Sequence, residues 1–170
     1  LFGDGAGAVV LGPGSEQQGF MSYTLGADGH GAELLEQPAG GTRCPATPES
    51  LAQNLQFLQM DGRSVFKWAI RTLSDSVNQV LDAANLTADE IDLTLFHQAN
   101  IRIIDAAAGD LGLPMEKVFV NLDKYGNTSA ASIPLALAEA VEQQRVAAGQ
   151  HVLISGFGAG LAWGAGVWRW

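Results

Sequence analysis

The chain of 170 residues is 47% hydrophobic and 16% charged, which excludes an intrinsically disordered protein and suffices for a domain with its own core. Its formal net charge of −9 argues against nucleic acid or an anionic membrane as a partner. The single cysteine, Cys44, cannot form an internal disulfide, so we expect a protein of the reducing cytoplasm.

The first residues are rich in glycine. Gly3, Gly5 and Gly7 precede the apolar run Val9–Leu11, which predicts a strand. Because phosphate-binding glycine loops follow a strand and open a helix, this order argues against a dinucleotide site. The chain starts within this motif, without a methionine or a signal-peptide pattern, so we interpret it as a fragment with a polar boundary at Pro13–Gln18.

A predicted strand at Gly19–Leu25 is followed by a long irregular region, Gly26–Ser50, which is rich in glycine, proline and threonine. Cys44 lies in this region directly before Pro45, and a residue before proline favours an extended conformation. A reactive thiol usually lies at a helix N-terminus or beside a cation. We therefore do not expect Cys44 to be a nucleophile.

The longest predicted helix spans Asp61–Ala84, along which apolar residues recur at helical spacing. Three basic residues, Arg63, Lys67 and Arg71, recur every four positions on another face of this helix. These side chains form either an ordinary solvated face or a cationic stripe that docks phosphates or an acidic partner.

The second half of the chain predicts further strands and helices. Thr87 and Glu90 have the spacing of a capping box, and Pro134 lies inside a predicted helix, where it should cost a hydrogen bond and bend the axis. The uncharged run Val152–Trp168 is too short and too rich in glycine for a membrane span, so it is interpreted as two buried strands. The predicted elements are a strand at Ile91–Phe96, a helix at Ile101–Leu113, an extended segment at Val118–Asn121, a helix at Ser129–Gln144, and strands at His151–Ser155 and Leu161–Trp170.

Two polar residues lie where predicted strands pass into helices. His97 follows the strand Ile91–Phe96, and Asn127 follows the extended segment Val118–Asn121. Because ligands bind at the C-terminal ends of strands in open α/β sheets, the two side chains can point into one crevice. Taken singly, each has a simpler interpretation: a lone histidine is usually structural, and an asparagine before Thr-Ser usually caps a helix.

Four motifs occur in the order in which a known family has them: Phe2–Ala8, His97–Asn100, Tyr125–Ser132 and Phe157–Leu161. Together they resemble the C-terminal half of β-ketoacyl-acyl-carrier-protein synthase III, of the thiolase-like superfamily. The resemblance implies an α/β fold, a layered α/β/α arrangement that forms the C-terminal half of a duplicated fold. Residues 1–12 would be the last strand of a missing N-terminal domain, and residues 13–170 would be the C-terminal domain.

The resemblance also implies an activity. The enzyme would be an acyltransferase that initiates fatty acid biosynthesis by decarboxylative Claisen condensation of malonyl-acyl carrier protein with an acyl-CoA primer. His97 and Asn127 would donate hydrogen bonds to the enolate oxygen that forms as carbon dioxide leaves, and the backbone N–H of Ala159 would belong to a second oxyanion hole. The cysteine nucleophile would lie in the absent half, so the isolated chain should be inactive.

Further residues gain expected roles only through the resemblance. The residues expected to contact CoA or the acyl substrate are Gly62, Phe66, Asn100 and Phe157, and those expected to dock the carrier protein are Lys67, Arg71 and Arg102. The resemblance implies no metal, no cofactor beyond the CoA and carrier-protein thioesters, and a homodimer in the full-length enzyme. His30 and His151 match no catalytic position.

Two alternatives stay open. A related condensing or acyl-transferring enzyme of a polyketide or quinolone pathway would share the His97 and Asn127 pair but use another primer. A non-catalytic module that kept the fold is the second alternative, although such a module has no chemical need for both residues.

Overall fold

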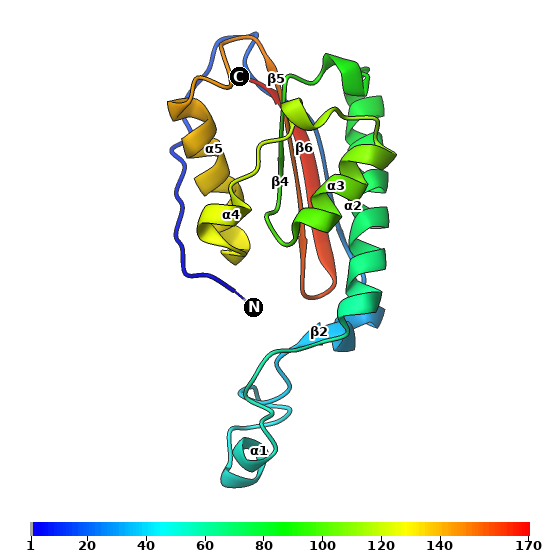
Figure 1. Ribbon diagram of the computed structural model, residues 1–170, viewed down its shortest axis with the longest axis vertical. Coiled ribbons are helices and arrows are strands. Elements are labelled where there is room, and N and C mark those ends of the chain that lie inside the picture. The colour runs from blue at the N-terminus through cyan, green and yellow to red at the C-terminus, as the bar shows by residue number, and fades with distance from the viewer. Residues whose placement is uncertain (1) are drawn as a thin grey trace.

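The computed structural model describes residues 2–170, which surround a four-stranded mixed sheet (Figure 1). The strands are β1 (Gly19–Ala27), β4 (Leu93–Phe96), β5 (His151–Gly158) and β6 (Ala162–Arg169), in the spatial order β1-β6-β5-β4. β4 and β5 are parallel, whereas β5 with β6 and β6 with β1 are antiparallel. The parallel pair brings the C-terminal ends of β4 and β5 to the same edge of the sheet.

Helices cover both faces of this sheet (Figure 1). The three longest are α2 (Gly62–Ala84), α3 (Ile101–Asp110) and α5 (Ser132–Glu142). Side chains alternate along β4, so that Leu93 and Leu95 pack in a cluster with α5 while Phe96 packs in the cluster of α2 and α3. The two cores lie on opposite faces of the sheet, which confirms the predicted layered α/β/α arrangement.

α2 is the helix predicted at Asp61–Ala84. Asp61 caps it, since its carboxylate accepts the backbone N–H of Ser64 at 3.1 Å. The helix ends at Asn85, whose φ of 54° is left-handed. Its apolar stripe is buried in the core through Val65, Ala69, Leu73, Val77, Val80 and Leu81.

Several predicted elements are confirmed with different bounds. The helix entry at Thr87 is a single 3₁₀ turn with the expected capping box. α3 ends before the predicted Leu113, because Gly112 takes a left-handed φ of 67°. Of the segment Val118–Asn121, only Val118 bridges to β4. The short elements here are η2 (Ala88–Glu90), η3 (Met115–Lys117), α4 (Leu122–Tyr125) and η4 (Ser129–Ala131).

The expected cost of Pro134 is wrong. The predicted helix Ser129–Gln144 consists of a 3₁₀ turn followed by α5, which begins at Ser132. Pro134 is therefore the third residue of the α-helix, and the first four N–H groups of a helix have no partner within it. A proline at this place removes no helical hydrogen bond and need not bend the axis.

The region Gly26–Ser50 is less irregular than predicted. It contains η1 (Gly29–Leu34), β2 (Leu35–Glu36) and most of the first turn of α1 (Pro48–Ala52). β2 pairs with β3 (Gln59–Met60) in a second, two-stranded antiparallel sheet. The chain between β2 and β3, including α1, extends away from the layered body (Figure 1). The periodicity of such short elements is too brief to recognise in a sequence.

The glycine-rich N-terminal segment forms no helix or strand in residues 2–14, so the strand predicted at Val9–Leu11 is not formed. The backbone N–H of Gly3 instead donates to the carbonyl of Asn127 at 2.7 Å, and Val10 is 99% exposed. The assignment of residues 1–12 to a preceding domain stays a prediction. Within residues 2–170, no helix has both the length and the apolar character that crossing a membrane requires.

Candidate active site

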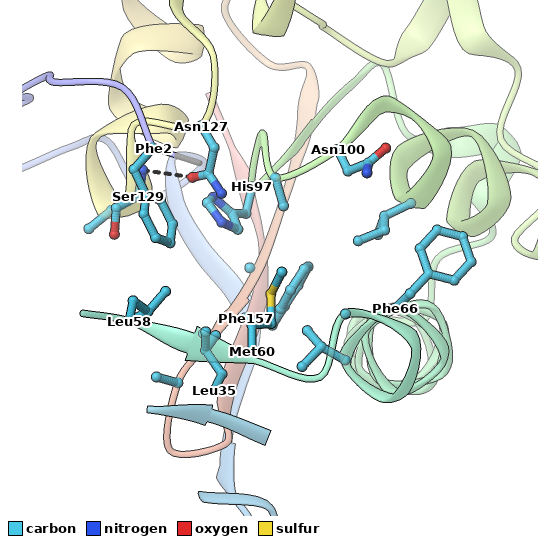
Figure 2. Close-up of a pocket in the computed structure, with 18 of the residues that line it drawn as sticks. Phe2, Leu35, Leu58, Met60, Phe66, His97, Asn100, Asn127, Ser129 and Phe157 are labelled. Carbon is cyan, nitrogen blue, oxygen red and sulfur yellow. Dashed lines mark hydrogen bonds between the residues drawn. The ribbon is translucent and has the colours of Figure 1, made fainter. Parts of the chain in front are cut away.

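A cavity of about 820 Å³ opens at the C-terminal ends of β4 and β5, a volume typical of a ligand pocket. Its walls come from the start of α2, the start of α3, the segment that leads into α5, and the β2–β3 sheet (Figure 2). Seven residues named from the sequence line it: Gly62, Phe66, His97, Asn100, Asn127, Phe157 and Ala159. The structure therefore brings the predicted pair and the expected substrate-contacting residues together around one space.

His97 is the first residue after β4. Its backbone N–H donates to the carbonyl of Ser155 at 2.9 Å, which continues the pairing with β5 and sets the direction of the side chain. The imidazole packs edge-on against Phe157, with 5.4 Å between ring centroids, and its Nδ1 lies 2.7 Å from the hydroxyl oxygen of Ser132. Figure 2 shows the remaining side of the ring facing the cavity.

The environment of His97 favours its neutral form. Burial lowers the pKa of the imidazole below its ordinary value, because a charged ring loses its hydration there. A neutral imidazole has one N–H donor and one acceptor nitrogen. With Nδ1 directed at Ser132, the other nitrogen, Nε2, is the one available to a bound molecule.

The lowered pKa of His97 makes folding stability depend on pH. Unfolded His97 binds a proton more tightly than folded His97, so its full contribution is present above the unfolded pKa of about 6.5 and is lost as pH falls toward the lower folded pKa. We expect the free energy of unfolding to decrease more steeply between about pH 7 and pH 5 in the wild type than in His97→Gln. Urea denaturation of the full-length protein at each pH measures this, and equal slopes would contradict it.

Asn127 is held by its own backbone neighbourhood. Its side-chain oxygen accepts the backbone N–H of Ser129, two positions along the chain, at 2.9 Å, which is a local turn bond. The N-cap of η4 is Thr128, so the interpretation of Asn127 as a helix cap is wrong. Only the oxygen of a carboxamide can accept an N–H. The bond to Ser129 therefore uses the Asn127 oxygen and leaves the amide nitrogen free to donate elsewhere. In Figure 2 that nitrogen points toward the part of the cavity that His97 borders. The local bond to Ser129 is thus compatible with a free amide donor in the same side chain.

Gln98 connects the chain around His97 with the segment that precedes Asn127, although the sequence predicts no role for it. Its side chain is 1% exposed, and its amide nitrogen donates to the carbonyls of Phe96 and Phe119 at 2.8 and 3.3 Å. Its oxygen accepts the backbone N–H of Asn121 at 3.2 Å. The residue next to His97 therefore binds the segment that leads to Asn127.

The turn between β5 and β6 forms another wall. Phe157 packs edge-on against Trp68 of α2 as well as against His97, with a centroid distance of 5.7 Å to Trp68. Ala159 follows at the exposed end of the turn and lines the cavity. Gly156 lies close to His97: a β-carbon at this position would lie 3.5 Å from the β-carbon of His97 and 3.3 Å from Ile133.

The three basic residues expected to dock a carrier protein do not line the cavity. Lys67, Arg71 and Arg102 are exposed on α2 and α3. Arg71 forms an exposed ion pair with Asp75, at 3.6 Å between the nearest nitrogen and oxygen. Arg102 donates its backbone N–H to Asn100, the N-cap of α3. Their role in docking stays a prediction.

Sequence reasoning missed some of the lining. Leu35 lies in β2, Met60 in β3 and Leu58 just before β3. No local pattern indicates that these residues fold over a site that lies so far along the sequence. Ser132 lies in the motif Tyr125–Ser132, but the sequence alone indicates no role for it. Among residues 2–170, no group of three or more histidine, cysteine, aspartate or glutamate side chains is arranged to hold a metal ion.

Comparison with known proteins places this geometry in a family. The family model for the C-terminal region of 3-oxoacyl-[acyl-carrier-protein] synthase III matches residues 81–170. The β-ketoacyl-[acyl-carrier-protein] synthase III of Roseiflexus sp. is 55% identical over 170 residues, which are 100% of this chain and 52% of that protein. The synthase III of Rhodopirellula baltica is 50% identical over 188 residues, covering 100% of this chain and 54% of its own length.

A solved structure of the same family has a similar fold. The synthase III of Thermus thermophilus superposes with a TM-score of 0.82 at 47% identity, covering 94% of this chain and 49% of the other. The chain thus spans about half the length of the relatives that it matches. The family match begins in the last turn of α2 and includes both His97 and Asn127. The chain belongs to the 3-oxoacyl-[acyl-carrier-protein] synthase III family and has the thiolase-like fold of its C-terminal region.

Proposed function

We propose that the chain is the C-terminal half of a β-ketoacyl-acyl-carrier-protein synthase III that initiates fatty acid biosynthesis. The reaction would be the decarboxylative Claisen condensation of malonyl-acyl carrier protein with an acyl-CoA primer. One observation carries the proposal: His97 and Asn127 border one cavity, and each has its other polar side-chain atom bound to the protein, to the Ser132 hydroxyl and to the Ser129 N–H.

The chemistry needs two hydrogen-bond donors. When the malonyl group loses carbon dioxide, the electron pair of the broken bond moves onto the thioester oxygen as an enolate. The Nε2–H of His97 and the amide N–H of Asn127 would bind that oxygen, already oriented and partly shielded from water. Neutral donors suit this step, because a full cation would also hold the carboxylate that has to leave. The burial that favours neutral His97 supports this role.

The enolate carbon would then attack an acyl group carried on a cysteine of the absent half. The new carbon–carbon bond forms as the cysteine thiolate leaves, and the product is a β-ketoacyl thioester on the carrier. The backbone N–H of Ala159 would help to bind the oxyanion of the acyl-enzyme steps, and Phe157 would wall the acyl pocket. Gly62, Phe66 and Asn100 would contact the CoA or pantetheine arm, which fits their place on the cavity wall.

Lys67, Arg71 and Arg102 would attract the acidic carrier protein. The chain as a whole carries a formal net charge of −9, so the attraction has to come from local basic groups. Arg71 already shares its charge with Asp75, which leaves Lys67 and Arg102 as the stronger candidates. We also propose that the full-length enzyme is a cytoplasmic homodimer, needs no cofactor beyond its thioester substrates, and has residues 1–12 as the last strand of its first domain.

The full-length protein tests this proposal. Supplied with malonyl-acyl carrier protein and a panel of acyl-CoA primers, it should release carbon dioxide and form β-ketoacyl-carrier product, both measurable by mass spectrometry. The preferred acyl-CoA would separate a fatty-acid enzyme from one that primes a polyketide or quinolone pathway. Acyl transfer without carbon dioxide release would contradict the proposal.

Cys44 offers a separate prediction. It lies between β2 and α1, does not line the cavity and pairs with no other cysteine, so Cys44→Ala in the full-length protein should leave the condensation rate unchanged. The 170-residue chain alone should show no condensation, and adding the other half should restore it. Turnover by the isolated chain that disappears in Cys44→Ala would refute the assignment of the nucleophile to the other half.

A further inference from the structure

The hydroxyl of Ser132 joins two neighbouring residues of the site. Ser132 is the first residue of α5, and it is 2% exposed. Its oxygen lies 2.7 Å from Nδ1 of His97 and 3.2 Å from the backbone nitrogen of Gln98. Helix capping does not explain these contacts, because both partners belong to the chain that follows β4 rather than to α5.

The protons in this small network can be assigned from what each group can do. The backbone N–H of Gln98 can only donate, so the Ser132 oxygen accepts there. The hydroxyl has one hydrogen of its own to donate, and within residues 2–170 its remaining hydrogen-bond partner is Nδ1 of His97. If Nδ1 carried a proton, the oxygen would receive two N–H groups and its own hydrogen would be buried without an acceptor.

We propose that Ser132 is a positioning residue that donates to Nδ1 of His97 and so holds the imidazole with its proton on Nε2, facing the cavity. Because Ser132 also accepts from Gln98, the backbone fixes the direction in which its hydroxyl donates. The burial of His97 acts in the same sense, since a protonated ring would place a hydrogen on Nδ1 and break this arrangement. The catalytic consequence rests on the proposed function, whereas the tautomer itself does not.

Nitrogen-15 NMR of the full-length protein with labelled histidine tests the tautomer directly, with the His97 signals identified by their loss in His97→Ala. We expect the unprotonated shift at Nδ1 and the protonated shift at Nε2 in the wild type. A protonated Nδ1 at neutral pH would overturn the proposal. This measurement needs no Ser132 variant, so it remains decisive if such a variant fails to fold.

Activity supplies the second readout. Ser132→Ala should lower kcat for malonyl-thioester decarboxylation on the order of tenfold with little change in KM, and Ser132→Thr, which keeps a hydroxyl, should restore most of the rate. Ser76→Ala is the matched control, because Ser76 is equally buried and bonded but does not touch His97, and it should leave kcat unchanged. Wild-type kcat in Ser132→Ala, where His97→Ala is impaired, would overturn the positioning role. Wild-type kcat in His97→Ala would instead overturn the proposed function.

Discussion

His97→Ala in the full-length protein is expected to slow malonyl-thioester decarboxylation by about 100- to 1,000-fold, the usual cost of removing one preorganised oxyanion donor. The donor acts on charge that appears only as carbon dioxide leaves, so the loss should fall on kcat rather than on KM. Carbon dioxide release from malonyl-acyl carrier protein measures it. His30→Ala is the control, since the His30 side chain is exposed on η1 and lies outside the cavity.

The same variant separates the enzyme from a non-catalytic relative. A binding module has no use for an imidazole N–H in its cavity, so its full-length form would show little decarboxylation and no difference between His97→Ala and His30→Ala. An unchanged rate in a protein that does decarboxylate would show that His97 is not an enolate donor, which would overturn the proposed function. A large loss in His97→Ala alone would assign the donor to the cavity beside β4.

The parts of the fold that long, regular patterns encode could be predicted from the sequence. The apolar stripe of α2 runs from Val65 to Leu81, and the short β4, whose four residues are all buried, lies between two buried layers. Both elements were recognisable in the sequence from periodicity and composition. The shorter elements were not. Pro134 was misjudged because the sequence does not show where a 3₁₀ turn ends and an α-helix begins, and that boundary decides whether a proline costs a hydrogen bond.

The candidate site also has parts that could be predicted from the sequence and parts that could not. His97 could be named because it follows a buried strand, and both His97 and Asn127 lie in motifs that resemble those of a family. The predicted strand-to-helix junction at Asn127 is wrong, because α4 lies between Val118 and Asn127. The bonds that hold them could not be read from the sequence, because Ser132 reaches His97 across 35 positions and Gln98 reaches Asn121 across 23. Neither contact leaves a periodic signal. The β2–β3 wall is a further case, since its two strands are joined by more than twenty residues without regular pattern.

Gln98→Leu should destabilise the full-length protein by about 2–4 kcal/mol, a large effect for a substitution that preserves side-chain size and adds apolar character. Leucine cannot accept the Asn121 N–H or donate to the carbonyls of Phe96 and Phe119. These buried backbone groups would lose the partner that Gln98 supplies. The urea midpoint of unfolding measures the change, provided that the slope of the transition is preserved. Gln143→Leu, an exposed change on the chain just after α5, should alter stability by less than about 0.5 kcal/mol.

Gln98→Leu should also reduce kcat although it touches no substrate. Its amide joins the residue before His97 to the segment that precedes Asn127, so its loss lets the two donors move relative to each other. Hydrogen bonds to a developing charge depend steeply on such geometry, and a displacement of about 1 Å can cost on the order of a hundredfold in rate. A Gln98→Leu protein that is no less stable than Gln143→Leu would contradict the role of this amide in the fold. If the Gln98→Leu protein is instead less stable and still has wild-type kcat under conditions where it is folded, other contacts set the spacing of His97 and Asn127.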